Sequence, residues 1–186
     1  MKQSKYIILF LLLLSFGLLF SFSNKSFQED PTKRLDWTGS SQLTWSDFED
    51  IPPGYYQRNI AALTCSIIQY RYHCSDGKIQ TSVKAIFQKD KSWVRESAKT
   101  HHYLRHEQLH FDITELFARK LRKFLSQREY KCDEVEELEE IITVFLDEWR
   151  DLQKKYDLET HYSLSEGMQE NWMKYVDELM TYYEDY

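Results

Sequence analysis

The spacing of apolar residues changes near residue 90 and divides the chain into two parts. Before this point apolar and polar residues alternate, as in a strand with one buried face. After Asp90 apolar residues recur every three or four positions, as in amphipathic helices. Strands followed by helices define the α+β class. We therefore predict a small N-terminal antiparallel β-sheet followed by a bundle of about three helices.

The strand signals lie between residues 35 and 87. Residues 35–48 predict a short strand, a Gly-Ser turn and a second strand, and residues 60–72 are rich in β-branched and aromatic side chains. Ser75-Asp76-Gly77 is typical of a hairpin turn. The returning strand would place one set of side chains on a single face: Ile79, Thr81, Val83, Ala85 and Phe87.

The helical part predicts three segments, at about residues 97–127, 133–155 and 166–183. The second has an apolar stripe every three or four residues and an acidic first turn, which favours a helix N-terminus. The stripe consists of Val135, Leu138, Ile142, Phe145 and Trp149.

The first helical segment contains His106-Glu107-Gln108-Leu109-His110. Residues four apart share a helix face, so both imidazoles can reach one metal ion, and Glu107 lies where it can take a proton from water. With six His among 186 residues, chance would produce this pattern in roughly one or two such chains per hundred. Ile113 and Phe117 lie within about 20° of His106 on the helical wheel. The pair therefore lies on a buried face, either as metal ligands or as hydrogen-bonded core histidines.

A catalytic zinc usually has three protein ligands and one open position. Glu115 lies half a helical turn from the histidine face. His102 shares that face but lies ~12 Å from His110 along the axis, too far to bind the same ion.

The segment from Tyr156 to Ser163 separates two helices and concentrates ligand-type side chains. We expect His161 to be the third ligand, although a solvated loop histidine is the alternative. Asp157 and Glu159 are the weaker candidates, either as ligands or as carboxylates that orient the imidazoles.

The N-terminal segment predicts export. Lys2 and Lys5 precede an apolar run at residues 6–20, and small residues follow it up to Ser23. Residues 1–23 would be a signal peptide, or residues 6–20 would remain as a membrane anchor. Residues 24–34 read as a polar tether and residues 35–186 as one domain, in the periplasm or secreted.

Charge and cysteine content narrow the class of protein. The net charge is −6 and no cluster of Lys and Arg indicates nucleic-acid binding. Cys65 and Cys74 would lie ~30 Å apart on one extended segment, beyond the reach of a disulfide. A bridge to Cys132 remains open, and the spacings do not fit a zinc–cysteine site.

Several motifs resemble a bacterial family catalogued as a domain of unknown function, whose members are described as predicted secreted zinc-dependent proteases. The resemblance covers about residues 35–180 and implies a zinc cofactor and peptide-bond hydrolysis. It rests on residues 43–48, 92–94, 106–113 and 156–160 and on the pair Gln169 and Trp172.

The chain departs from the family pattern at one position. The family has a His two positions after the Thr, where this chain has Tyr162, followed by Ser163. His161 would take over the ligand role, Tyr162 would ligate as a phenolate, or the site would have lost its third ligand.

These patterns predict an exported zinc-dependent hydrolase that acts on a peptide or protein substrate, with Glu107 as general base and His106, His110 and His161 as ligands. The alternative is a non-catalytic exported binding module with a degenerate or structural zinc site. Hydrolysis of a non-peptide bond is a third option for such a site.

Overall fold

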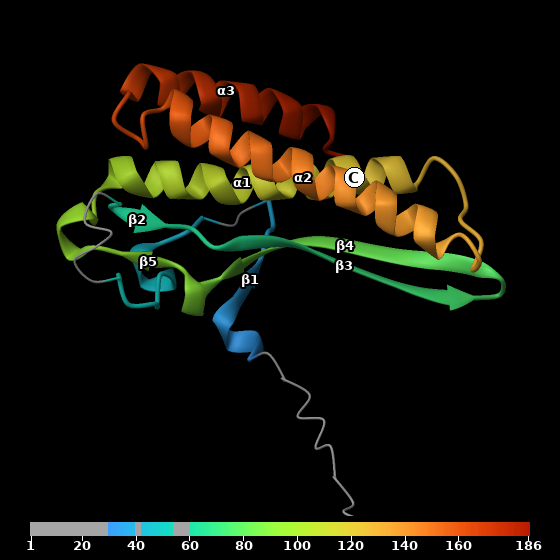
Figure 1. The fold of residues 1–186 in the computed structure, drawn as a ribbon. Coiled ribbons are helices and arrows are strands. Elements are labelled where there is room, and N and C mark those ends of the chain that lie inside the picture. The colour runs from blue at the N-terminus through green and yellow to red at the C-terminus, as the bar shows by residue number, and fades with distance from the viewer. Residues whose placement is uncertain (1–29, 40–41, 54–59) are drawn as a thin grey trace, which may run out of the picture.

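The computed structural model describes residues 30–39, 42–53 and 60–186. The antiparallel sheets lie on one side, and a long helix, α1, separates the main sheet from two further helices (Figure 1). This arrangement confirms the predicted α+β class. The expected signal peptide or anchor and most of the tether lie outside the described residues. Within the described residues, no helix is long and apolar enough to cross a membrane.

The main sheet has the strand order β1-β4-β3, formed by β1 (Arg34–Asp36), β3 (Ser66–Ser75) and β4 (Lys78–Gln88). Asp76 and Gly77 both have positive φ, as a tight hairpin between β3 and β4 requires. The predicted hairpin turn is therefore confirmed. The predicted inner face of β4 is buried except at Thr81, near the hairpin end.

A second, two-stranded sheet pairs β2 (Ala62–Leu63) with β5 (Trp93–Val94). The second strand predicted to end at Phe48 is wrong. Residues Trp45–Asp47 form a 3₁₀ turn, because the Asp47 carboxylate accepts hydrogen bonds from the Thr44 backbone N–H and hydroxyl. Asp47 also pairs with Lys89, which secures the turn next to the sheet.

The three predicted helices are α1 (His101–Leu125), α2 (Val135–Glu159) and α3 (Glu166–Tyr182). Thr100 caps α1, since its hydroxyl accepts the backbone N–H of Tyr103. Helix α1 packs against the sheet on one side and against α2 and α3 on the other. It therefore buries residues on two faces, among them Leu109, Phe111, Ile113, Phe117 and Leu121.

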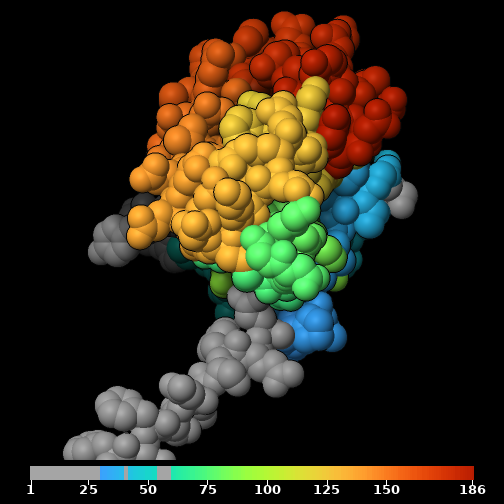
Figure 2. Space-filling model, turned by 90° about the vertical axis from the view of Figure 1, so that its right-hand side faces the viewer, coloured from blue at the N-terminus to red at the C-terminus, as the bar shows by residue number. Residues whose placement is uncertain are grey.

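A disulfide between Cys74 and Cys132 joins the hairpin tip to the connection between α1 and α2. Backbone hydrogen bonds from Ile79 N–H to the Tyr130 carbonyl and from Cys132 N–H to the Gly77 carbonyl reinforce the junction. Figure 2 shows the green hairpin tip packed against the orange residues beside it. Of the two pairings left open for Cys132, the structure contains the one with Cys74, and Cys65 is a free thiol.

Candidate metal centre

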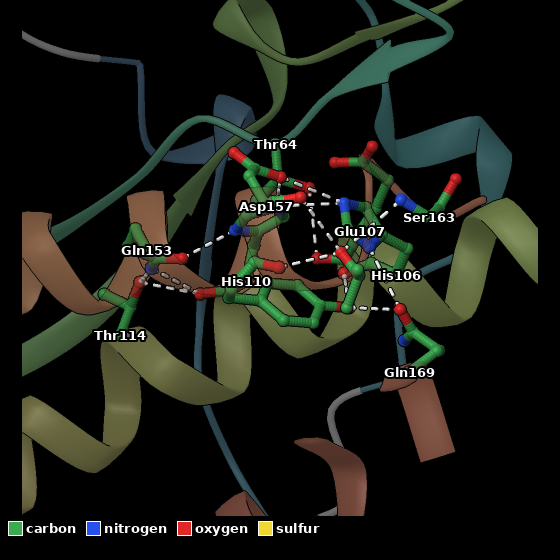
Figure 3. Close-up of polar contacts among 11 residues, drawn as sticks. Thr64, His106, Glu107, His110, Thr114, Gln153, Asp157, Ser163 and Gln169 are labelled. Atoms are coloured by element: carbon green, nitrogen blue, oxygen red, sulfur yellow. Dashed lines mark hydrogen bonds and ion pairs between the residues drawn. The ribbon is translucent and has the colours of Figure 1, made fainter. Parts of the chain in front are cut away.

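His106 and His110 lie one turn apart on α1 and present their Nε2 atoms to each other at 3.3 Å. From α2, the Oδ1 atom of Asp157 lies 3.2 Å from Nε2 of His106 and 3.1 Å from Nε2 of His110 (Figure 3). Three atoms with lone pairs therefore converge from two helices. Among the described residues, these three side chains form the group of His, Cys, Asp or Glu close enough to hold one metal ion.

The separations within this triad of His106, His110 and Asp157 fit a bound metal ion. An ion held tetrahedrally at about 2.0–2.1 Å places its ligand atoms about 3.3–3.4 Å apart. The observed distances of 3.1–3.3 Å therefore need little adjustment. Two imidazole nitrogens and one carboxylate oxygen form a donor set that zinc accepts, and other divalent transition metals share this preference.

The electrostatics of the triad favour a positive charge at its centre. Burial alone would raise the pKa of Asp157, but hydrogen bonds to His106 and His110 hold it well below its usual range. Burial would lower the pKa of His110, but the hydrogen bond to Asp157 and the charge of Glu107 raise it. A proton on one of the rings would supply this positive charge, and so would a metal ion between the three atoms.

The remaining ring nitrogens face glutamine side chains. Nδ1 of His110 lies 2.6 Å from Oε1 of Gln153 on α2, and Nδ1 of His106 lies 3.1 Å from Oε1 of Gln169 on α3. The ring of Tyr156 stacks on His106 at 4.6 Å between centroids and meets His110 edge-on. Burial raises the pKa of Tyr156, so its hydroxyl stays protonated and donates to Gln169 Oε1.

Glu107 is the buried acid of the motif, with 4% of its surface exposed. Its backbone carbonyl accepts a hydrogen bond from the Thr64 hydroxyl, which joins this turn of α1 to the residue after β2. Its carboxylate is close enough for its charge to act on His110 and Tyr156. The acid is thus held beside the triad in a region sheltered from water.

The structure brings Asp157, and not His161, to the two histidines. Helix α2 continues to Glu159, four residues beyond the predicted end, so Asp157 is still helical and faces α1. His161 follows the helix end in a turn where three consecutive residues, His161, Tyr162 and Ser163, have positive φ. The side chain of His161 is exposed, and so is that of Tyr162, at 64%.

Several other candidate residues also have different partners. Glu159 accepts a hydrogen bond from Trp172 Nε1 and so joins α2 to α3. His102 Nε2 contacts the Ser163 carbonyl oxygen, which holds the turn after α2 against the start of α1. Asp112, on the same helix as the histidine pair, is not part of the triad and accepts a hydrogen bond from Trp37 Nε1. It lines a cavity of about 740 Å³ between α1 and α3 that the triad does not line.

The apolar stripe of α2 contains a signal for Gln153, which the sequence patterns did not single out, and for Asp157. Continued past Trp149 with helical spacing, it reaches residues 153, 156, 157 and 160. These positions are Gln153, Tyr156, Asp157 and Thr160, all of which face α1 or are buried. Polar residues on a buried stripe need partners, which makes them site candidates.

Fold and site define an α+β protein in which an HExxH helix and the helix that follows it contribute a His-His-Asp triad that could hold a metal ion. The chain belongs to the family of bacterial proteins of unknown function called DUF922, whose family model matches residues 56–167. The match includes the whole triad together with Glu107 and Gln153. No curated protein and no solved structure matches the chain.

Proposed function

We propose that the protein is a zinc-dependent hydrolase of the peptidase class, with His106, His110 and Asp157 as the metal ligands. The observation that carries this proposal is the convergence of three donor atoms at 3.1–3.3 Å beside the buried Glu107. Three protein ligands leave a fourth position open, as catalytic zinc sites do and structural sites do not. Asp157 takes the place that the sequence had suggested for His161.

When bound, zinc would lower the pKa of a water molecule towards about 7 and polarise a scissile carbonyl group. Glu107 would accept the proton from the attacking water and deliver it to the leaving amine nitrogen. Its burial excludes competing solvent around that proton. Asp157 would supply the negative charge that holds a divalent ion between the two rings.

Export is part of the proposal. The Cys74–Cys132 disulfide supports it, since structural disulfides persist in oxidising compartments such as the periplasm or the extracellular space. The positively charged start and apolar run of residues 2–20 agree with such a location.

Metal analysis and a Glu107→Gln variant test this function. We expect about one zinc per chain in the wild type and in Glu107→Gln, and peptide cleavage only in the wild type. Glu178→Gln, an exposed acid on α3, is the matched control and should cleave as the wild type does. A protein that binds zinc but cleaves no peptide, with Glu107→Gln unchanged in every property, would support the binding-module alternative. If the wild-type protein has no affinity for zinc, the proposal of a zinc-dependent hydrolase is wrong.

A further inference from the structure

Gln153 makes three contacts from α2 to one turn of α1. Its Oε1 atom faces Nδ1 of His110 at 2.6 Å. Its Nε2 atom donates to the His110 backbone carbonyl at 2.9 Å and to the Thr114 hydroxyl at 3.1 Å. One side chain thus holds both the ring and the backbone of the same histidine.

The orientation of the Gln153 amide is determined by its donors. A backbone carbonyl oxygen can only accept a hydrogen bond, so the atom facing His110 O must be the NH₂ group. Thr114 strengthens the arrangement, because its own hydroxyl donates to the His110 carbonyl and it also accepts from Trp149 Nε1. The opposite end of the amide, facing the ring, must therefore be the acceptor oxygen.

Gln169, the corresponding residue at His106, lacks this constraint. Its Oε1 accepts from the Tyr156 hydroxyl, but its buried Nε2 has no hydrogen-bond partner among the described residues. No hydrogen bond donated by the NH₂ group of Gln169 therefore determines whether the oxygen or the nitrogen of this amide faces the His106 ring. Gln153 is the glutamine whose orientation the fold determines.

We propose that Gln153 is a positioning residue that keeps the proton of His110 on Nδ1 and thereby leaves Nε2 as the metal-binding lone pair. Both ring nitrogens face an acceptor oxygen, but Gln153 Oε1 lies 2.6 Å from Nδ1, whereas Asp157 Oδ1 lies 3.1 Å from Nε2 and is shared with His106. When the ring carries one proton, the shorter contact places that proton on Nδ1. The neutral ring can then present only Nε2 to Asp157 and the ion. Because the acceptor is an amide and not a carboxylate, it adds no charge to the site.

This proposal rests on the proposed metal site but can be tested without metal. Long-range ¹H–¹⁵N spectra of the metal-free protein, followed to a pH at which His110 is neutral, show which nitrogen keeps its proton. We expect Nδ1 to keep it in the wild type and Nε2, which faces Asp157, to keep it in Gln153→Leu. A wild-type His110 with its remaining proton on Nε2 would overturn the proposal, whether or not the protein binds zinc.

Zinc affinity provides the second readout. Removing a residue that orients a metal-bound histidine typically costs 10–100-fold in affinity, which we expect for Gln153→Leu. Gln153→Glu keeps an acceptor oxygen and should keep the Nδ1 proton, so it tests the tautomer if the leucine variant does not fold. Gln80→Leu, at an exposed position of β4, should bind zinc as the wild type does. Equal zinc affinity in Gln153→Leu and wild type would refute the positioning role.

Discussion

Asp157 enters the candidate metal centre because α2 keeps its helical path as far as Glu159. Its backbone carbonyl accepts from Tyr162 N–H, and Thr160 N–H bonds to the Tyr156 carbonyl. The bond from Thr160 is the last helical one, and the bond from Tyr162, which spans five residues, ends the helix just beyond Asp157 and turns the chain outwards. One residue of the segment from Tyr156 to Ser163 is thereby brought to the histidine pair, while His161 is directed to solvent.

Exchanging Asp157 for Asn removes the ligand charge with almost no change in size. We expect zinc affinity to fall on the order of 100-fold or more, because two neutral rings and an amide attract a divalent ion poorly. His161→Ala should bind zinc as the wild type does. Competition with a chromophoric chelator measures the zinc affinity of both variants. A large loss in His161→Ala and none in Asp157→Asn would show that His161 is the ligand.

The raised pKa of His110 gives metal binding a specific pH dependence. Without metal, the ring keeps its second proton to a pH above the usual value of about 6.5, and zinc must displace it. Zinc affinity should therefore fall, by up to about tenfold per pH unit for each displaced proton, as the pH drops below that raised pKa. Calorimetry in two buffers of different ionisation enthalpy counts the protons released when zinc binds. If no proton is released near neutral pH, the pKa of His110 is not raised.

At the scale of elements, α1 connects the sheet to the site. It is buried on two faces, so the same helix that packs Phe111 towards Phe87 of β4 presents the histidine pair to α2. The packing of α2 on α1 then determines the distances from the Asp157 and Gln153 side chains to the histidine rings. Leu138 and Ile142, both almost fully buried, hold this helix in the core together with Tyr156.

Truncating Leu138 to Ala tests how much α2 packing contributes to stability. The side chain is 0% exposed, so the lost contacts and the cavity should cost about 2–5 kcal/mol of unfolding free energy. Val144→Ala, 56% exposed on the same helix, should change it by less than about 0.5 kcal/mol. Urea unfolding compares the two, and similar losses would mean that α2 does not pack as described.

At the scale of the whole molecule, the disulfide joins two segments that are distant in sequence. Cys74 and Cys132 lie 58 residues apart and connect the sheet hairpin to the helical part. The triad lies elsewhere on α1 and α2, so this bridge can contribute to stability without taking part in the site. Cys65, which donates to Gln88 Oε1, is half-buried beside the sheet.

Replacing Cys132 by Ser removes the bridge. We expect a loss of about 2–4 kcal/mol in unfolding free energy, because the unfolded chain gains the freedom of the opened loop. Cys65→Ser should have a much smaller effect. Thermal unfolding with and without reductant measures the loss, and a thiol assay on denatured wild type should find one free cysteine. Three free thiols in the purified protein would refute the bridge.

Much of the architecture follows from the sequence because it depends on local periodicity. Alternation along β4, the Asp76-Gly77 turn and the helical stripes are short-range properties, and the three helices and the hairpin agree with them. The strand predicted at residues 45–47 is a 3₁₀ turn instead, because the Thr44–Asp47 capping interaction outweighs the β-propensity of that segment. The histidine pair could be predicted for the same reason, since a spacing of four residues on a helix brings two rings to one face.

The sequence by itself determined the α+β class, the helix with its two histidines, and Glu107 beside them. Only the tertiary structure decided which third side chain meets the pair, which glutamines hold the rings, and which cysteine pairs with Cys132. These contacts join residues 43 to 63 positions apart. Their distances depend on where α2 ends and how it packs on α1, and no local spacing encodes that.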